Sequence, residues 1–213
     1  MPVPAVAAPS RFKRSILAES VKLAVATTRS YPPVAVLALP DKKTGGIVVK
    51  AVNDRLTKQK LELQITTLDS AGKPLIIKNI KTNVPTDKAV ELVKLKKEAL
   101  PAGHILIIDY VAADGGKGRV HFANEPYKAL SIINPEISHS AKIKDGKLHI
   151  ALLSKHMALF VTAETGVFGS YSDNVLDMLS NEKTEIIFTP DNPAELETAQ
   201  KNLIIRNLYS SSH

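Results

Sequence analysis

Apolar and polar residues alternate along much of this chain, which is the period of a β-strand with one buried face. The clearest case is the segment 60–67, where Leu61, Leu63 and Ile65 alternate with Lys60, Glu62 and Gln64. Further apolar segments lie at residues 75–80, 89–95, 105–112 and 119–122, separated by turn signals at Pro85, 101–103 and 114–116. Short strands at roughly ten-residue spacing predict an all-β sandwich.

Three apolar segments precede these strands. Residues 16–25 alternate as a first strand, and residues 34–39 form a short apolar run with Pro33 before it and Pro40 after it. Because proline cannot donate to a central ladder, the flanking prolines predict an edge strand or a crossing segment and not a central strand. Gly45 and Gly46 then open a third strand, 47–52, which ends at Asn53-Asp54 in a turn.

A second set of strands follows residue 131. Residues 137–144 and 148–153 flank Asp145-Gly146, a strong signal for a two-residue hairpin. His139 and His149 fall on these two strands and can face each other, with His156 further along. Without a carboxylate at a metal-ligand spacing, we expect surface histidines and no metal site.

The segment 156–189 predicts strand, turn, strand, turn, strand. Gly166 and Gly169 end the first strand. The turn Tyr171-Ser172-Asp173-Asn174 follows, and its side chains can accept hydrogen bonds from nearby backbone N–H groups. Asp177 follows in the next strand. If Asp173 or Asn174 makes such a bond, Asp173→Ala should destabilise the second domain by about 1–2 kcal/mol.

These residues resemble the last β-sandwich domain of glycoside hydrolase family 2 β-mannosidases. The family pattern is a strand, Gly, Phe-Ser-Asp-Asn, an aromatic, Asp-Leu, and Pro-Gly-Glu before a final group of strands. Tyr171, Ser172, Asp173, Asn174 and Asp177 match this structural motif, and Asn181-Glu182 stands where Pro-Gly-Glu is usual.

Other parts of the chain extend the resemblance. The segment 203–209 resembles the family's terminal strand, Val52-Asn53-Asp54 is similar to a segment of the penultimate sandwich, and Phe12-Lys13-Arg14 looks like the exit from the catalytic barrel. The resemblance implies the C-terminal accessory region of an exoglycosidase that removes terminal β-linked mannose. Its implied partner is the enzyme's catalytic (β/α)₈ barrel.

One helix is predicted, near the C-terminus. Asn192 is a suitable N-cap, Pro193 suits the first helical position, and Glu195 suits the third, so the helix runs to about Gln200 and covers one sheet edge. The fold class is therefore all-β, with two consecutive immunoglobulin-like β-sandwiches at residues 10–130 and 131–213. The second sandwich carries the helix, and residues 1–9 form a flexible lead-in.

Composition narrows the classes of function. The 213 residues contain no cysteine, which excludes a disulfide framework and thiolate chemistry. No apolar run approaches the roughly 20 residues of a membrane-spanning helix, and the start lacks a signal peptide's charged region, so we expect a soluble chain of unassigned compartment. The net charge is +7, but the lysines are scattered and aromatic residues are only 5%, which argues against nucleic acid.

Asn124-Glu125-Pro126 is the acid/base signature of many barrel glycosidases. Here it follows the last strand of a sandwich, and the chain has no strand-helix alternation long enough for a barrel. We therefore expect Glu125 to lie in a linker turn and assign no catalytic residue, cofactor or metal. The sequence is compatible both with a natural product and with a piece of a longer chain.

Two other classes remain open. A stand-alone carbohydrate-binding module needs aromatic faces for sugar rings, and without tryptophan its platforms would be Tyr110, Tyr127 and Tyr171. An adhesion or structural sandwich would share the fold, because fold alone does not fix function.

Overall fold

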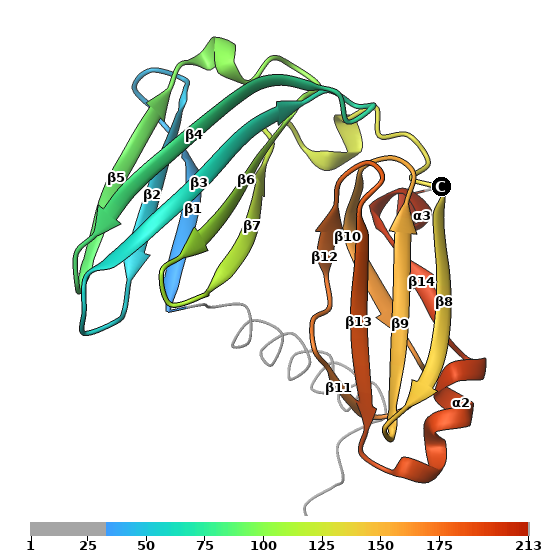
Figure 1. Ribbon diagram of the computed structural model, residues 1–213. Helices are drawn as coiled ribbons and strands as arrows, with labels where there is room; N and C mark the ends of the chain where they lie inside the picture. Colours follow the sequence, from blue (N-terminus) through green and yellow to red (C-terminus); the bar gives the residue numbers. More distant parts are fainter. Residues whose placement is uncertain (1–32, 213) are drawn as a thin grey trace, which may run out of the picture.

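The computed structural model describes residues 33–212. The predicted lead-in, the strand at 16–25 and the segment Phe12-Lys13-Arg14 lie outside the described residues. The described part forms two β-sandwiches that meet at one end and diverge from it (Figure 1). The prediction of an all-β chain with immunoglobulin-like sandwiches is confirmed.

The first sandwich packs a three-stranded antiparallel sheet, in the order β1-β2-β5, against a four-stranded sheet, β4-β3-β6-β7. Its strands are β1 (Val34–Pro40), β2 (Ile47–Asn53), β3 (Gln59–Leu68), β4 (Pro74–Val84), β5 (Lys88–Leu95), β6 (Ile105–Ala112) and β7 (Lys117–Phe122). A 3₁₀ turn, η1 (Lys97–Ala99), follows β5. Strand β1 is an edge strand, as its flanking prolines predict.

The core of the first sandwich follows the alternation in the sequence. Leu61, Leu63 and Ile65 of β3 are buried between the sheets, while Glu62 and Gln64 point outward and are exposed. Strand β6 departs from this pattern, because Ile105 and Ile107 are buried on its outer face as well. A second layer must therefore cover that end of the strand.

The second sandwich consists of the sheets β11-β13-β9-β8 and β12-β10-β14. Its strands are β8 (Ile137–Lys144), β9 (Lys147–Ser154), β10 (Ala158–Glu164), β11 (Gly169–Tyr171), β12 (Leu176–Met178), β13 (Lys183–Pro190) and β14 (Ile204–Arg206). The β8–β9 turn has positive φ at both Asp145 (49°) and Gly146 (70°). Positive φ at both central residues is what a type I′ hairpin requires, so the predicted hairpin is confirmed.

The two histidines of this hairpin do not face each other, contrary to the expectation. His139 pairs with Leu152, and His149 pairs with Lys142. The two-residue turn sets this register, because it places Lys144 opposite Lys147 and fixes every pair beyond them. His149 instead lies 3.1 Å from the carboxylate of Glu185 on β13.

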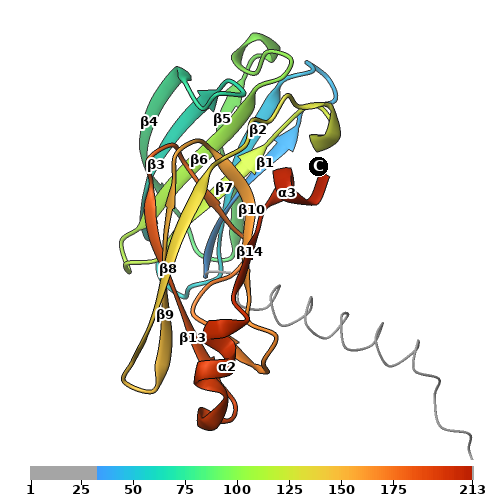
Figure 2. The ribbon, with the colours of Figure 1, turned by 90° about the vertical axis from the view of Figure 1, so that its right-hand side faces the viewer.

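The predicted helix forms as a 3₁₀ turn, η3 (Pro193–Glu195), followed by α2 (Leu196–Lys201). Asn192 caps it by accepting a hydrogen bond from the N–H of Ala194 at 3.2 Å. Gln200 donates to the carbonyl of Ala141 on the edge strand β8, so the helix covers this edge as expected. Figure 2 shows α2 at the end of the second sandwich that is far from the first.

The expected closing strand at 203–209 is only partly correct. Strand β14 ends at Arg206, and a last helical turn, α3 (Leu208–Ser212), follows. The side chain of Asn207 accepts a hydrogen bond from the N–H of Ser210 at 3.0 Å, which is how an N-cap starts a helix. In the described residues, none of the helices has the length and apolar character needed to cross a membrane.

Candidate functional site: the junction between the two sandwiches

An apolar cluster joins the sandwiches, and it explains the two-sided burial of β6. Leu68, Ile105 and Ile107 from the first sandwich pack with Met157 and Leu159 from the second. The connecting segment adds Leu130, beside its 3₁₀ turn η2 (Tyr127–Ala129). All of these side chains are buried, so the two sandwiches share a core here instead of touching through a polar surface.

The β3–β4 turn meets the second sandwich at a glycine. Gly72 has φ +82°, and a Cβ added there would lie 2.6 Å from the hydroxyl of Ser180. Its other neighbour is Met157 of the junction cluster, at 3.5 Å. Both the left-handed backbone and the close approach therefore require glycine at this position.

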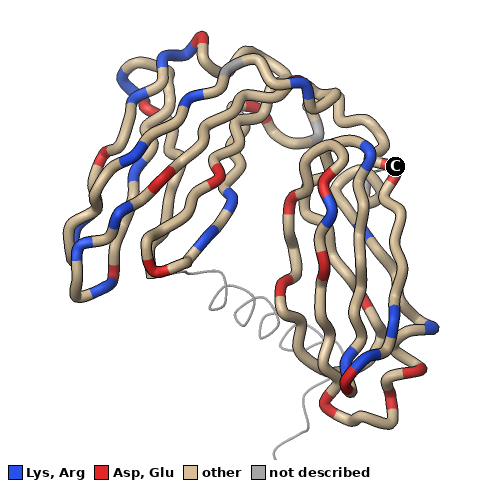
Figure 3. The backbone as a smooth tube through the Cα atoms, in the orientation of Figure 1, with Lys and Arg blue, Asp and Glu red and all other residues tan. Residues whose placement is uncertain are grey.

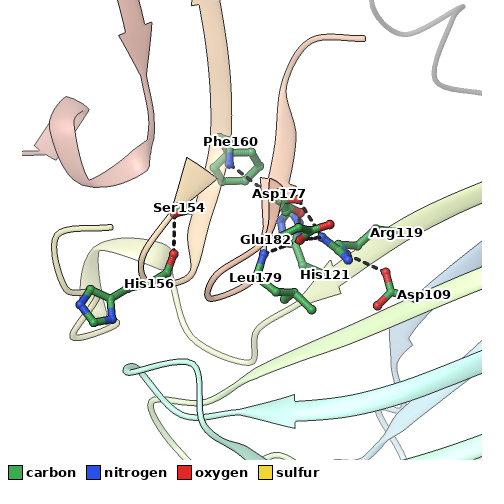
Figure 4. A network of polar contacts seen from close by, with 9 residues as sticks. All are labelled: Asp109, Arg119, His121, Ser154, His156, Phe160, Asp177, Leu179 and Glu182. Carbon is green, nitrogen blue, oxygen red and sulfur yellow. Dashed lines mark hydrogen bonds and ion pairs between the residues drawn. The ribbon is translucent and has the colours of Figure 1, made fainter. Parts of the chain in front are cut away.

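A charged cluster borders the apolar one, with Arg119 of β7 at its centre (Figure 4). Its guanidinium donates to Asp109 on β6 at 2.6 Å and, in the second sandwich, to the carboxylate of Glu182 at 2.6 Å and the carbonyl of Asp177 at 2.9 Å. Glu182 also accepts from the N–H of Leu179 at 2.6 Å. One planar cation thus connects a strand pair of the first sandwich to a turn of the second.

The pKa of Arg119 reflects this cluster. Burial alone would lower the pKa of the guanidinium, because it disfavours the charged form. The hydrogen bonds and charges of Glu182 and Asp109 outweigh burial and raise the pKa above its ordinary value. The cluster therefore stabilises the charged form of Arg119.

Three rings complete the junction, one from each part of the chain. His121 of β7, Tyr127 of the connecting segment and Phe160 of β10 pack edge to face, with centroids 4.9–5.6 Å apart. The ring of His121 also hydrogen-bonds the carboxylate of Asp177. Burial, with a smaller contribution from the charge of Asp177, raises the pKa of the Tyr127 hydroxyl. Edge-to-face packing of this kind favours one relative orientation of the sandwiches.

Asp177 also holds a strained backbone position. Phe160 has φ +53° at an irregularity in the β10–β12 pairing, and its N–H donates to the Asp177 carboxylate at 3.0 Å. A bulky residue rarely adopts positive φ, so the surrounding structure must maintain it. Asp177 therefore connects the conformation of β10 to the first sandwich through His121.

The remaining motif residues act within the second sandwich. Asn174 accepts from the N–H of Ala163 at 2.9 Å and donates to its carbonyl at 3.2 Å, so its side chain takes the place of a neighbouring strand beside β10. Ser172 accepts from the N–H of Ile187 at 2.9 Å. The ring of Tyr171 packs against Phe188, with centroids 4.7 Å apart. Asp173 is exposed, and its carboxylate accepts a hydrogen bond from the backbone N–H of the next residue, Asn174.

Sequence reasoning missed Arg119, Asp109 and His121 as junction residues. Glu182 was noted only as part of the motif. On β7, Lys117, Arg119 and His121 alternate with smaller or apolar residues and indicate an outward face. Nothing in this pattern identifies the partner of Arg119, which lies about 60 positions away along the chain. The one local signal was the continuous apolar run Ile105-Leu106-Ile107-Ile108, which is typical of a strand buried on both faces.

Other candidate residues have structural positions. The carboxylate of Glu125 accepts from the N–H of Gly103 at 2.9 Å, which fixes a turn next to the connecting segment. Tyr110 is only 5% exposed, and the rings of Tyr127 and Tyr171 pack at the junction and against Phe188. The three tyrosines that a stand-alone carbohydrate-binding module would use are therefore packed against other side chains. Within residues 33–212, no three His, Asp or Glu side chains are placed to hold a metal ion.

The fold and the junction define a class of protein: two immunoglobulin-like sandwiches joined through a shared core. Residues 132–211 match the Ig_mannosidase family, an Ig-fold domain, which confirms the predicted resemblance for the second sandwich. No curated protein sequence matches the chain.

Two solved structures share the arrangement. A β-D-mannosidase from Dictyoglomus thermophilum has a TM-score of 0.69 and 18% identity, covering 83% of this chain and 22% of that chain. The exo-chitosanase CsxA from Amycolatopsis orientalis has a TM-score of 0.54 and 11% identity, covering 81% of this chain and 25% of that chain. At these identities the likeness shows the fold. The chain spans about a quarter of the length of each enzyme.

Proposed function

We propose that this chain is the non-catalytic C-terminal accessory region of a family 2 β-mannosidase. Its role is to support the catalytic (β/α)₈ barrel that hydrolyses terminal, non-reducing β-D-mannose residues. The family match of the second sandwich supports this role. So does the likeness to a β-D-mannosidase, because it covers more of the chain than either sandwich alone contains.

The observation that carries the proposal is the junction. Two sandwiches on a flexible linker would move independently and could not present one surface to a partner. Here a shared apolar core, the Arg119 cluster and the three packed rings fix their relative orientation. A supporting region needs a fixed relative orientation of its two sandwiches, because hinge motion between them would otherwise weaken their contact with a barrel.

A surface on the first sandwich suits the barrel as partner. Leu37 and Leu39 point outward from the edge strand β1 and are 41% and 40% exposed. Their cross-strand neighbours on β2 are Lys50 and Val48. Exposed apolar side chains grouped in this way are typical of a surface that contacts a partner.

The first test is enzymatic. The purified chain should release no 4-nitrophenol from 4-nitrophenyl β-mannoside, because Glu125 serves a turn and not an acid/base pair. Activity that disappears in Glu125→Gln would contradict the proposal.

The second test is structural. The barrel of the same enzyme, expressed without its C-terminal sandwiches, should gain thermal stability and activity when the chain is added in trans. The variant Leu37→Glu with Leu39→Glu should lose this effect while its own melting temperature stays near that of the unmodified chain. If the unmodified chain restores neither property, the adhesion class is favoured instead.

A further inference from the structure

A cleft of about 2180 Å³ separates the two sandwiches beyond their junction. Figure 1 shows the two sandwiches diverging from the junction on this side. Its floor is the outer face of the sheet β4-β3-β6-β7, and its opposite wall is formed by β10 and the segment 165–177. The junction closes one end.

The floor is organised in cross-strand rows. The row next to the junction is apolar at β6, where Ile107 lies between Thr66 and His121. The next row, Asn79–Gln64–Asp109–Arg119, is polar on all four strands. The row after it, Lys81–Glu62–Val111–Lys117, is polar on every strand except β6. The same sheet face therefore changes from a buried apolar surface to an open polar one within one row.

Several groups in these rows are available to a ligand. Among the described residues, the side-chain amides of Gln64 and Asn79 have no hydrogen-bond partner, and Lys117 has no ion pair. Both amides are exposed. Val111 interrupts the polar rows and is 53% exposed. Across the cleft, the ring of Phe168 is 77% exposed and Val175 is also exposed.

The charge of the residues that line the cleft restricts which class of ligand it can bind. The whole chain has a net charge of +7, yet Asp and Glu outnumber Lys and Arg among the residues that line the cleft. Figure 3 shows acidic residues along the edge of the second sandwich that faces the first. A polyanion such as nucleic acid is therefore disfavoured here, because the carboxylates would repel it.

We propose that this cleft binds a neutral oligosaccharide. Each amide offers both donors and an acceptor, and these match sugar hydroxyls, which also donate and accept. Val111 and Phe168 offer apolar contacts to the C–H faces of sugar rings. With strands about 4.8 Å apart, a four-strand row spans roughly 14 Å, the length of about three sugar units.

This inference goes beyond the supporting role and does not depend on it. The cleft lies on a different face of the first sandwich from Leu37 and Leu39. The two proposals are tested separately. A cleft that binds no oligosaccharide would not change the result expected of the barrel experiment, and a negative barrel experiment would not change the binding expected at the cleft.

The test is titration of the ¹⁵N-labelled full chain with β-1,4-mannohexaose, followed by NMR. We expect chemical-shift changes at Gln64, Asn79, Val111 and Phe168. The variant Gln64→Ala with Asn79→Ala should weaken binding about tenfold, as the loss of one or two hydrogen bonds would. Asn83→Ala is the matched control: it is exposed on the same strand, does not line the cleft, and should leave the affinity unchanged.

Cello-hexaose and a heparin hexasaccharide define the ligand class. Binding of either neutral hexasaccharide at these residues supports the proposal. It is overturned if neither neutral hexasaccharide shifts the cleft resonances at millimolar concentration, if heparin binds there instead, or if the double variant binds as well as the unmodified chain. Thermal melts of all variants establish that they remain folded.

Discussion

The two ends of one sheet face differ more than the two sandwiches do. At the junction end of the β4-β3-β6-β7 sheet, Ile107 points outward and is 0% exposed, because the second sandwich covers it. Four residues further along the same strand and on the same face, Val111 is 53% exposed. The backbone pairing is continuous between them. What separates a structural surface from an available one is therefore the presence of the second sandwich, and not the strand itself.

The largest expected effect comes from shortening an outward β-branched side chain at each end of this sheet face, Ile107 at the junction and Val111 in the cleft. Ile107→Ala should lower the free energy of unfolding by about 3 kcal/mol, because it leaves a cavity in the shared core. Val111→Ala should change it by less than about 1 kcal/mol, since its side chain is already half in water. Urea denaturation of both variants measures the difference. Equal losses would mean that the junction is not a packed core.

The second prediction concerns the cation that borders the apolar cluster. Arg119→Ala should cost about 2 kcal/mol, because it leaves Asp109 and Glu182 without their shared donor in a partly buried site. Small-angle X-ray scattering should also show a broader distribution of distances between the sandwiches. Arg119→Lys should rescue only part of the effect, because an ammonium cannot reproduce the planar fork.

Arg55 is the control for Arg119. It pairs with Asp114 at 2.8 Å within the first sandwich, and its side chain is about half exposed. Exposed ion pairs contribute little, so Arg55→Ala should cost less than about 1 kcal/mol and leave the scattering profile unchanged. A change in the profile of Arg55→Ala equal to that of Arg119→Ala would show that the orientation does not depend on the junction.

The last prediction compares two neighbouring residues of the motif, Asn174 and Asp173, of which Asp173 is expected to have the smallest effect on stability. Asn174→Ala should destabilise the chain by about 1–2 kcal/mol, because it leaves the N–H and carbonyl of the buried Ala163 without their partner. Asp173→Ala should cost less than about 0.5 kcal/mol, since its side chain is exposed. This replaces the larger cost that the sequence assigned to Asp173. Thermal and urea melts distinguish the two, and equal shifts would contradict the assignment.

Local patterns predicted much of the fold. The alternation in β3 predicted which residues are buried, Asp145-Gly146 predicted the hairpin, and Asn192-Pro193 predicted the start of the helical segment. These succeed because each depends on a few neighbouring residues and on backbone geometry. The terminal helix α3 was missed because the apolar residues from 203 to 209 read as one continuous strand. The strand in fact ends at Arg206, and Asn207 then caps a helical turn.

The motif shows where local reasoning stops. Its residues were found because of their order in the sequence, but Asp177 and Asn174 have different roles. Asn174 bonds a strand of its own sandwich, and Asp177 bonds His121, more than fifty positions earlier. Nothing in the turn distinguishes an acceptor that serves its own loop from one that serves another domain.

The sequence by itself determined most of the strands and turns of the described residues, because these depend on the period of apolar residues and on local turn chemistry. Only the tertiary structure decided what covers Ile107, which carboxylates share Arg119, and that the polar half of the same sheet stays open as a cleft. These contacts join residues far apart in the chain. Their geometry depends on how two finished sandwiches pack, which no local pattern encodes.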